Sequence, residues 1–292
     1  MNINTISKTK EILRKYDIKA KKRFGQNFLI DDNILSNIVN VANLSSNDLI
    51  IEIGPGLGNL TEYLLQTDSY CLLIEIDKNM IDILNDRFEL KKEKYTLINN
   101  DVLELNLDEI VEDLEKKLNK KFEKVKVVAN LPYYITTPII FKLLQDSKKI
   151  NDIIVMVQKE VAERMVAKNN TKDYGILTLM IEYMGIGKIE FIVDKNSFIP
   201  APDVTSAVIS IHKQKRFNVC DEKLLFNLIH LSFANRRKKM INSLQMNNFN
   251  NMTKKELESV FTALKIDFNV RAEQLPLESY IKIIEYIKTE HL

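Results

Sequence analysis

The stretch I-E-I-G-P-G-L-G-N-L, residues 51–60, decides the fold class. Three of the seven glycines in this chain of 292 residues fall within it, at Gly54, Gly56 and Gly58. They follow a short apolar run and precede a helix-like segment, residues 59–65. Glycine lets the backbone approach a ligand closely and take φ angles that a side chain forbids. A strand-to-helix turn that merely needs glycine would explain one of the three, so we interpret the stretch as a ligand-binding loop at the edge of an open sheet.

Short β-branched runs recur along the chain, with helical segments between them. These runs are residues 49–53, 71–76, 95–98, 125–129 and 152–157. The alternation predicts βαβ units and a parallel sheet with helices on both faces. Two further runs, residues 188–193 and 206–212, are joined by a proline-containing loop and predict a hairpin. We therefore expect an α/β fold with a Rossmann-like sheet of about seven strands, the last pair a hairpin.

The strand signal stops after about residue 213. The remaining apolar segments have the helical spacing of Leu, Ile and Phe, and they cover residues 222–234, 254–264 and 277–287. We therefore predict two domains. Residues 1–213 form the sheet domain with its basic N-terminal segment, and residues 214–292 form a smaller, all-helical domain.

The composition excludes several classes of protein. No stretch approaches the ~18 apolar residues of a membrane span, and the first twenty residues lack the apolar core of a secretory signal. We expect a cytoplasmic location and no membrane partner. The two cysteines and three histidines are scattered, which argues against a disulfide framework and against a Cys/His zinc site. We expect no metal.

Positive charge is unevenly placed along the chain, although the formal net charge is only +2. Residues 1–24 carry eight Lys or Arg against two acids, and residues 236–239 read R-R-K-K. Such runs are usually solvated surface. Because two of them flank the predicted sheet, we favour phosphate binding. A mitochondrial transit peptide is a weaker interpretation of the first run, since it is rich in lysine and contains acids.

The spacing of the glycines separates two cofactor classes. The dinucleotide fingerprint is G-x-G-x-x-G, whereas the sixth position here is Asn59. The observed form, acid-x-G-x-G-x-G, resembles the first motif of S-adenosylmethionine-dependent methyltransferases. Glu75 ends the next strand, where a carboxylate can accept hydrogen bonds from ribose hydroxyls. Asp101 follows the third strand and could accept one from an adenine amine. Glu75 would suit NAD as well, so only the whole set favours S-adenosylmethionine.

The tetrad N-L-P-Y, residues 130–133, follows the fourth apolar run. It is similar to the (D/N/S)-P-P-(Y/F) motif of enzymes that methylate exocyclic amino groups of bases. The lone pair of adenine N6 is delocalised into the ring, so two acceptors must draw the nitrogen towards sp³ geometry. We assign the side-chain oxygen of Asn130 and the main-chain carbonyl of Pro132. The alternative is a strand exit capped by asparagine, with the tyrosines packed on a helix.

Two aromatic side chains are candidates for stacking on the target base. Tyr133 offers a flat face beside the amide, and stacking of this kind contributes about 1–3 kcal/mol per base. Phe198 begins the stiff stretch F-I-P-A-P-D-V-T-S-A-V, residues 198–208, and would cover the other face. A core phenylalanine beneath that loop is an equally compatible interpretation of Phe198.

Six stretches taken together resemble the KsgA-type rRNA adenine dimethyltransferases. They are K-K-R-F-G-Q-N-F-L (21–29), E-I-G-P-G-L-G-N-L-T (52–61), N-L-P-Y-Y-I-T-T-P (130–138), Y-G-I-L (174–177), F-I-P-A-P-D-V-T-S-A-V (198–208) and F-A-N-R-R-K-K-M (233–240). The resemblance implies a class I methyltransferase sheet and S-adenosylmethionine as cofactor. It also implies dimethylation of N6 of two adjacent adenosines in the 3′-terminal hairpin loop of 16S rRNA, within precursors of the small ribosomal subunit, by a monomer. One departure is Asp203, where many relatives have lysine.

The resemblance also implies roles for individual residues. The cofactor contacts would be Asn27, Leu29, Gly54, Gly56, Glu75, Ile76, Asp101, Val102 and Asn130. The catalytic set would be Asn130, Pro132, Tyr133 and Phe198. The RNA contacts would be Lys21, Lys22, Arg23, Arg236, Arg237 and Lys238.

Three other functions stay open at this point. The Erm-type methyltransferases share the fold and pocket but modify 23S rRNA; Leu131 and the V-T-S-A-V continuation favour the KsgA type by resemblance. A non-catalytic assembly or transcription factor would use only the basic surface to bind rRNA. An NAD-dependent dehydrogenase is disfavoured by the glycine spacing and by the lack of a side chain placed for hydride chemistry.

Overall fold

The computed structural model describes residues 5–18 and 27–290 and divides the chain into two compact units. The first unit is Met1–Ala162 with Gly187–Lys213, and the second is Glu163–Ile186 with Gln214–Leu292. Our sequence-based division kept residues 163–186 in the sheet domain, whereas the structure groups them with the helices. The reason is helix α8 (Ile176–Met184), whose apolar side chains are part of the helical core.

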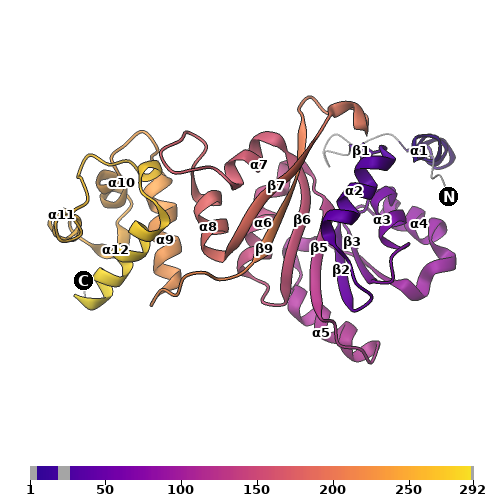
Figure 1. Cartoon of the computed structure of the whole chain (residues 1–292), viewed down its shortest axis with the longest axis horizontal. Helices are drawn as coiled ribbons and strands as arrows, with labels where there is room; N and C mark the ends of the chain where they lie inside the picture. Colours follow the sequence, from indigo (N-terminus) through magenta and orange to yellow (C-terminus); the bar gives the residue numbers. More distant parts are fainter. Residues whose placement is uncertain (1–4, 19–26, 291–292) are drawn as a thin grey trace. The chain divides into compact units, whose positions relative to one another are not determined.

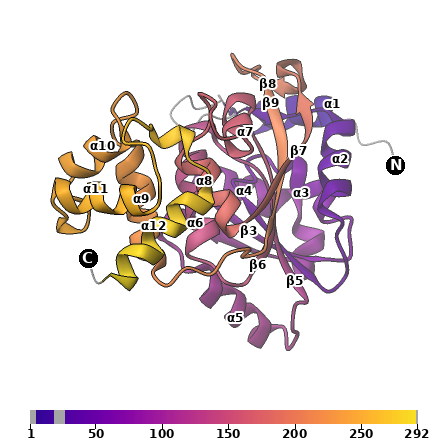
Figure 2. The same ribbon diagram turned by 60° about the vertical axis from the view of Figure 1, so that its left-hand side comes forward.

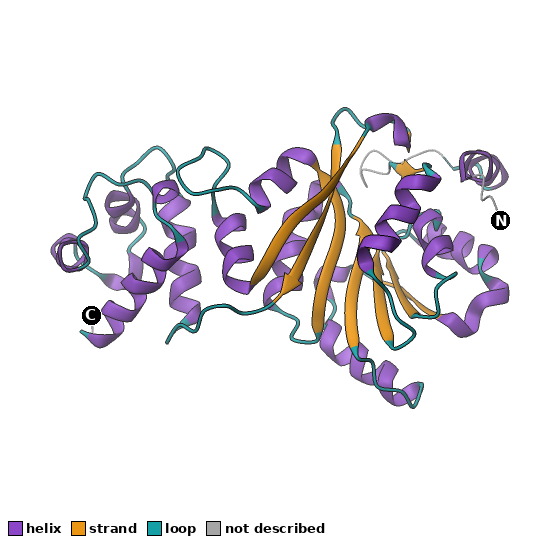
Figure 3. Cartoon of the chain, in the orientation of Figure 1, coloured by secondary structure: helices purple, strands orange, loops and turns teal. Residues whose placement is uncertain are grey.

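Seven strands form one mixed sheet in the order β4-β3-β2-β5-β6-β9-β7 (Figures 1 and 3). Their bounds are β2 (Asp48–Ile53), β3 (Tyr70–Glu75), β4 (Tyr95–Asn99), β5 (Lys124–Asn130), β6 (Ile150–Gln158), β7 (Gly185–Val193) and β9 (Ser206–Lys213). The strands from β2 to β6 pair in parallel, and β9 pairs antiparallel to β6. Every residue of β2 is buried, as expected for an interior strand of a covered parallel sheet. The predicted fold class is confirmed, including the final strand pair.

Helices follow the strands of the first unit. They are α2 (Asp32–Ala42), α3 (Asn59–Leu64), α4 (Lys78–Arg87), α5 (Leu107–Lys117), α6 (Thr136–Gln145) and α7 (Lys159–Met165), the last of which runs into the second unit. Several of these helices have a side-chain N-cap. Asp77, for example, accepts a hydrogen bond from the Asn79 amide at 3.2 Å and so caps α4. Helices α2 and α3 pack on the sheet face that carries Ile50, Leu73 and Val128.

Three elements of the first unit, one helix and two short strands, lie where the sequence analysis predicted none. Helix α1 (Thr5–Lys15) lies near the N-terminus, and the two-residue strands β1 (Phe28–Leu29) and β8 (Phe198–Ile199) pair antiparallel, with Leu29 opposite Phe198. This pairing brings two of the quoted sequence stretches side by side. Strands this short carry no periodicity that a sequence pattern could show.

The second unit consists of helices around a core of its own (Figure 2). Besides α8 they are α9 (Glu222–Phe233), α10 (Met240–Met246), α11 (Lys254–Ala263) and α12 (Leu277–Thr289). Leu228, Phe261 and Ile284 are fully buried in that core. In the part of the chain that is described, no helix has the length and apolarity to cross a membrane.

Candidate active site

One cavity opens at the carboxyl ends of β2, β3 and β5, where ligands of open α/β sheets bind. The cavity and the open space at its mouth together have a volume of about 1020 Å³. All nine residues of the predicted cofactor set line it, namely Asn27, Leu29, Gly54, Gly56, Glu75, Ile76, Asp101, Val102 and Asn130. Pro132 and Tyr133 line it as well, so the structure brings together stretches that are far apart in the sequence.

The glycine loop needs its glycines. Gly54, Gly56 and Gly58 have φ angles of 68°, 56° and 81°, in the left-handed region that side chains rarely adopt. At Gly58 a Cβ would also lie 2.6 Å from the Cε2 of Phe88. The Gly54 amide donates to the Ile74 carbonyl at 2.9 Å, which fixes the loop to the end of β3.

The carboxylate of Glu75 is held in place by main-chain donors. Its Oε2 accepts from the Gly56 amide at 3.0 Å and its Oε1 from the Asp77 amide at 2.8 Å. The side chain is buried, and that burial raises the pKa of Glu75. Each carboxylate oxygen has a further lone pair, so Glu75 can accept hydrogen bonds from the two hydroxyls of a ribose at the cavity wall.

The segments that follow β3 and β4 form an apolar slot with one acid at its side. Ile76, 47% exposed, and Val102, buried, both line the cavity together with Asp101. Asp101 caps the turn Val102–Glu104 by accepting from the Leu103 amide at 2.9 Å, which sets the direction of its side chain. Two apolar side chains and one acceptor fit a purine ring with an exocyclic amine.

A second glutamate, Glu52, lies deeper in the same wall. It is 2% exposed, lines the cavity, and accepts a hydrogen bond from the Thr61 hydroxyl at 2.6 Å. Burial raises the pKa of Glu52 to about 8, and the charge of Glu75 adds to the effect. Our sequence analysis assigned no role to this acid, although the acid-x-G-x-G-x-G pattern contains it.

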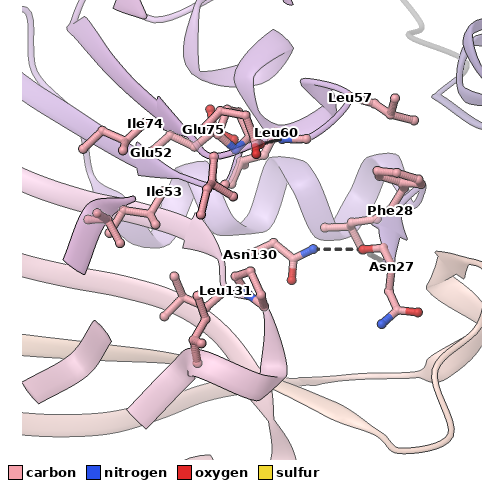
Figure 4. A pocket seen from close by; sticks show the side chains of 18 of the residues that line it. Asn27, Phe28, Glu52, Ile53, Leu57, Leu60, Ile74, Glu75, Asn130 and Leu131 are labelled. Atoms are coloured by element: carbon pink, nitrogen blue, oxygen red, sulfur yellow. Dashed lines mark hydrogen bonds between the residues drawn. The ribbon is translucent and has the colours of Figure 1, made fainter. Parts of the chain in front are cut away.

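The amide of Asn130 has a defined orientation. Its Nδ2 donates to the main-chain carbonyl of Asn27 at 3.2 Å (Figure 4). The Oδ1 atom therefore lies on the other side of the amide and accepts no hydrogen bond from the described residues. Both residues line the cavity, so this oxygen is available to a ligand's N–H.

The second acceptor differs from our prediction. The Pro132 carbonyl already accepts from the Ile135 amide at 3.3 Å and from the Thr136 hydroxyl at 3.0 Å, which uses both of its lone pairs. It does not offer the acceptor we expected. The preceding carbonyl, that of Leu131, accepts no hydrogen bond within residues 5–18 and 27–290. Its peptide is held because the Leu131 amide donates to the Met156 carbonyl at 3.1 Å.

The two predicted stacking residues are placed differently. Tyr133 lines the cavity and its hydroxyl hydrogen-bonds Ser206 Oγ at 2.5 Å, which fixes the ring. Phe198 does not line the cavity: it is 3% exposed and packs in the core beside Leu29 and Val208. The core interpretation of Phe198 describes this structure. Tyr134, which the sequence analysis did not single out, lines the cavity and is 53% exposed.

The predicted RNA contacts fall in two groups. Lys21, Lys22 and Arg23 lie outside the described residues. Arg236, Arg237 and Lys238 are exposed on the second unit, between α9 and α10. Arg236 donates to the main-chain carbonyls of Lys172 and Tyr174 at 2.7 and 2.8 Å, so it also has a structural role.

The remaining polar groups do not suggest a metal centre. Over the described ranges, no three His, Cys, Asp or Glu side chains are grouped closely enough to hold an ion. Cys71 is buried and Cys220 is exposed, and neither forms a disulfide.

Comparison with known proteins matches residues 17–289 to the family described as Ribosomal RNA adenine dimethylase. The chain belongs to this family. It is 40% identical over 285 residues to the Ribosomal RNA small subunit methyltransferase A of Lactococcus lactis, covering 97% of this chain and 95% of that protein. It is 43% identical over 282 residues to the protein of the same name from Alkaliphilus oremlandii, with 95% of each covered.

Solved structures agree with the rRNA adenine dimethylase fold. The dimethyladenosine transferase from Plasmodium falciparum superposes with a TM-score of 0.74 at 25% identity, covering 91% of this chain and 98% of that one. The resemblance to this enzyme class that the sequence suggested is confirmed. The chain is an rRNA adenine dimethyltransferase with S-adenosylmethionine as its cofactor, and the acceptors and carboxylates of the cavity fit that molecule.

Proposed function

We propose that this dimethyltransferase modifies N6 of two adjacent adenosines in the 3′-terminal hairpin loop of 16S rRNA, within precursors of the small ribosomal subunit, and acts as a monomer. The observation that supports the reaction is the cavity itself, which places the Asn130 amide oxygen beside the predicted cofactor wall. The observation that supports the substrate is the 40–43% identity to relatives named for the small subunit.

The residues of the predicted cofactor set hold the two ends of the cofactor molecule. Glu75 accepts from the ribose hydroxyls, and Asp101 accepts from the adenine amine between Ile76 and Val102. The glycine loop and the wall formed by Asn27 and Leu29 enclose the methionine end. S-adenosylmethionine supplies a methyl group on a positively charged sulfur.

The target base is gripped by two oxygens in consecutive residues. Asn130 Oδ1 and the Leu131 carbonyl each accept one N6–H, which draws N6 towards sp³ geometry and exposes its lone pair to the methyl donor. Positive charge develops on N6 as the new N–C bond forms and the methyl–sulfur bond breaks, with S-adenosylhomocysteine as the leaving group, and both acceptors stabilise that charge. The proton then leaves to water, since a methylated aryl ammonium is a strong acid. A monomethylated N6 has one N–H left, so the second transfer depends on a single acceptor.

Tyr133 provides the stacking face for the unpaired base. Its ring is fixed by Ser206, so stacking requires little further ordering. Contacts to phosphates come from the exposed Arg237 and Lys238, and from Lys21, Lys22 and Arg23, which lie outside the described residues; these position the RNA without reading its sequence.

Mapping N6-dimethyladenosine in rRNA from cells with and without this gene tests the proposal. We expect two adjacent modified positions near the 3′ end of 16S rRNA that disappear when the gene is deleted. Loss of a modification in 23S rRNA instead would assign the Erm type. Unchanged rRNA modification together with retained binding to ribosomal precursors would support the non-catalytic factor and contradict the proposal.

A further inference from the structure

Asn59 connects three distant parts of the chain through its side-chain amide. It is the first residue of α3, directly after the glycine loop, and only 6% of it is exposed. Its Nδ2 donates to the Leu29 carbonyl at 2.8 Å and to the Thr9 hydroxyl at 2.9 Å. Its Oδ1 accepts from Arg87 Nη1 at 3.2 Å. A buried amide with both donors used holds its partners in fixed positions.

The same network fixes two walls of the cofactor cavity. Leu29 belongs to the wall formed by β1, and Leu57 belongs to the glycine loop; both line the cavity. The Leu57 carbonyl accepts a hydrogen bond from Arg87, the residue that also donates to Asn59. Asn59, which itself lines the cavity, and Arg87 thus hold the β1 wall and the glycine loop together.

Helix α1 packs on the outside of these walls. Thr9 supplies the hydroxyl that Asn59 binds, and Ile12 and Leu13 pack against Phe28 and Leu57. Lys8 pairs with Glu62 at 2.6 Å, and Glu62 pairs in turn with Arg87 at 2.6 Å. The docking of α1 and the shape of the cavity therefore share one polar network.

We propose that Asn59 is a positioning residue for the cofactor: it fixes the Leu29 carbonyl, and with it the β1 wall, and through Thr9 it makes cofactor affinity depend on the docking of α1. The inference rests on the proposed assignment of this cavity to S-adenosylmethionine. Asn59 is the residue at which the loop departs from the dinucleotide spacing.

Two nearly isosteric substitutions test the hydrogen bonds that Asn59 Nδ2 donates to Leu29 and Thr9. Asn59→Asp keeps the shape and the Arg87 contact but places an oxygen against the Leu29 carbonyl, replacing an attraction by a repulsion. Thr9→Val removes the α1 contact and leaves the Leu29 contact. The control is Ser147→Ala, because the buried Ser147 hydroxyl donates a hydrogen bond to Asp108 and neither residue lines the cavity.

The experiment is titration calorimetry of S-adenosylhomocysteine with the full-length protein, together with steady-state kinetics and thermal unfolding. Each lost hydrogen bond contributes about 1 kcal/mol, which corresponds to a roughly fivefold change in Kd. We expect a Kd raised by about tenfold or more for Asn59→Asp and by about fivefold for Thr9→Val. The cofactor KM should rise in parallel, with kcat at saturating cofactor within about threefold of wild type.

The control decides between positioning and general destabilisation. Ser147→Ala should lower the Tm while leaving the Kd unchanged. Wild-type Kd in both Asn59→Asp and Thr9→Val, or an equal loss of affinity in Ser147→Ala, would overturn the proposal. If Asn59→Asp fails to fold, Thr9→Val carries the test alone. Wild-type protein that binds no S-adenosylhomocysteine would contradict the assignment of the cavity, which is a distinguishable result.

Discussion

The side-chain amide of Asn130 donates a hydrogen bond to the main-chain carbonyl of Asn27, 3.2 Å away. The two residues come from the end of β5 and from the segment before β1, so the bond joins the N-L-P-Y tetrad to another wall of the cavity. It also decides which atom of the amide remains available in the cavity: the donor is used within the protein, and the acceptor remains. The bond thus connects two parts of the chain that lie 103 residues apart in the sequence.

Replacing Asn130 by alanine should therefore remove an acceptor and loosen the wall at the same time. We expect kcat for methyl transfer to small-subunit precursors to fall by at least about 100-fold, as for the loss of one oriented partner at a site of developing charge. Asn47→Ala, which removes a surface amide bound to Glu123 at 2.9 Å, is the control and should keep full turnover. Turnover of Asn130→Ala within a few-fold of wild type would refute its assigned role.

The raised pKa of Glu52 predicts that the stability of the folded protein depends on pH. Burial raises the pKa of Glu52 from 4.5 to about 8 in the folded protein, so folding favours the protonated acid. That stabilisation is fully present below pH 4.5 and is lost as the pH rises through about 8, with a slope of up to about 1.4 kcal/mol per pH unit in between. Thermal unfolding from pH 5 to 9 without cofactor should show a steeper loss of Tm for wild type than for Glu52→Gln. Parallel curves would show that Glu52 does not titrate in this range.

The glycine loop gives a prediction with a built-in control. Gly58→Ala should destabilise the protein by more than about 1 kcal/mol, since φ is 81° and the new Cβ would lie 2.6 Å from Phe88. Gly175→Ala adds the same methyl group where no atom lies within 4 Å and the backbone is extended, so it should change the Tm little. Chemical denaturation of both variants measures the difference, and equal unfolding free energies would contradict the argument.

Two neighbouring residues of the basic cluster of the second unit, Arg236 and Arg237, should differ in function. Arg237→Ala should weaken binding to small-subunit precursors and reduce its salt dependence, without changing the Tm, because the side chain is exposed and we propose that it contacts phosphate. Arg236→Ala should lower the Tm as well, because the guanidinium holds the carbonyls of Lys172 and Tyr174. Filter binding at several salt concentrations and thermal unfolding test both statements. A destabilised Arg237→Ala or a fully stable Arg236→Ala would show that the roles were assigned wrongly.

The sheet could be predicted because its strands are buried apolar runs with polar turns, a signal that lies within each segment. Glu75 and Asp101 could be predicted because both follow strands of one parallel sheet, whose carboxyl ends meet. The unit to which α8 belongs could not be predicted, because the apolar residues of a helix do not show which hydrophobic core the helix joins. Phe198 could not be placed either, since its neighbour Leu29 is brought to it by a pairing of two-residue strands.

The Pro132 carbonyl, which already accepts two hydrogen bonds, shows another limit of prediction from sequence. Whether a main-chain oxygen is available depends on the turn that follows, and here the Ile135 amide and the Thr136 hydroxyl both bind it. The sequence shows which residues carry acceptors, while only the folded turn shows which acceptors remain.

The grouping of residues 163–186 with the helices has a consequence for the engineering of this protein. The chain passes from one unit to the other after Ala162, after Ile186 and after Lys213, which makes three crossings. A truncation after residue 213 would not release an independent sheet domain, because it would leave α8 with Leu179 and Tyr183 deprived of their partners. Exchanging the helical unit with that of a related enzyme would accordingly require splicing at three positions, so a single crossover cannot transfer this unit intact.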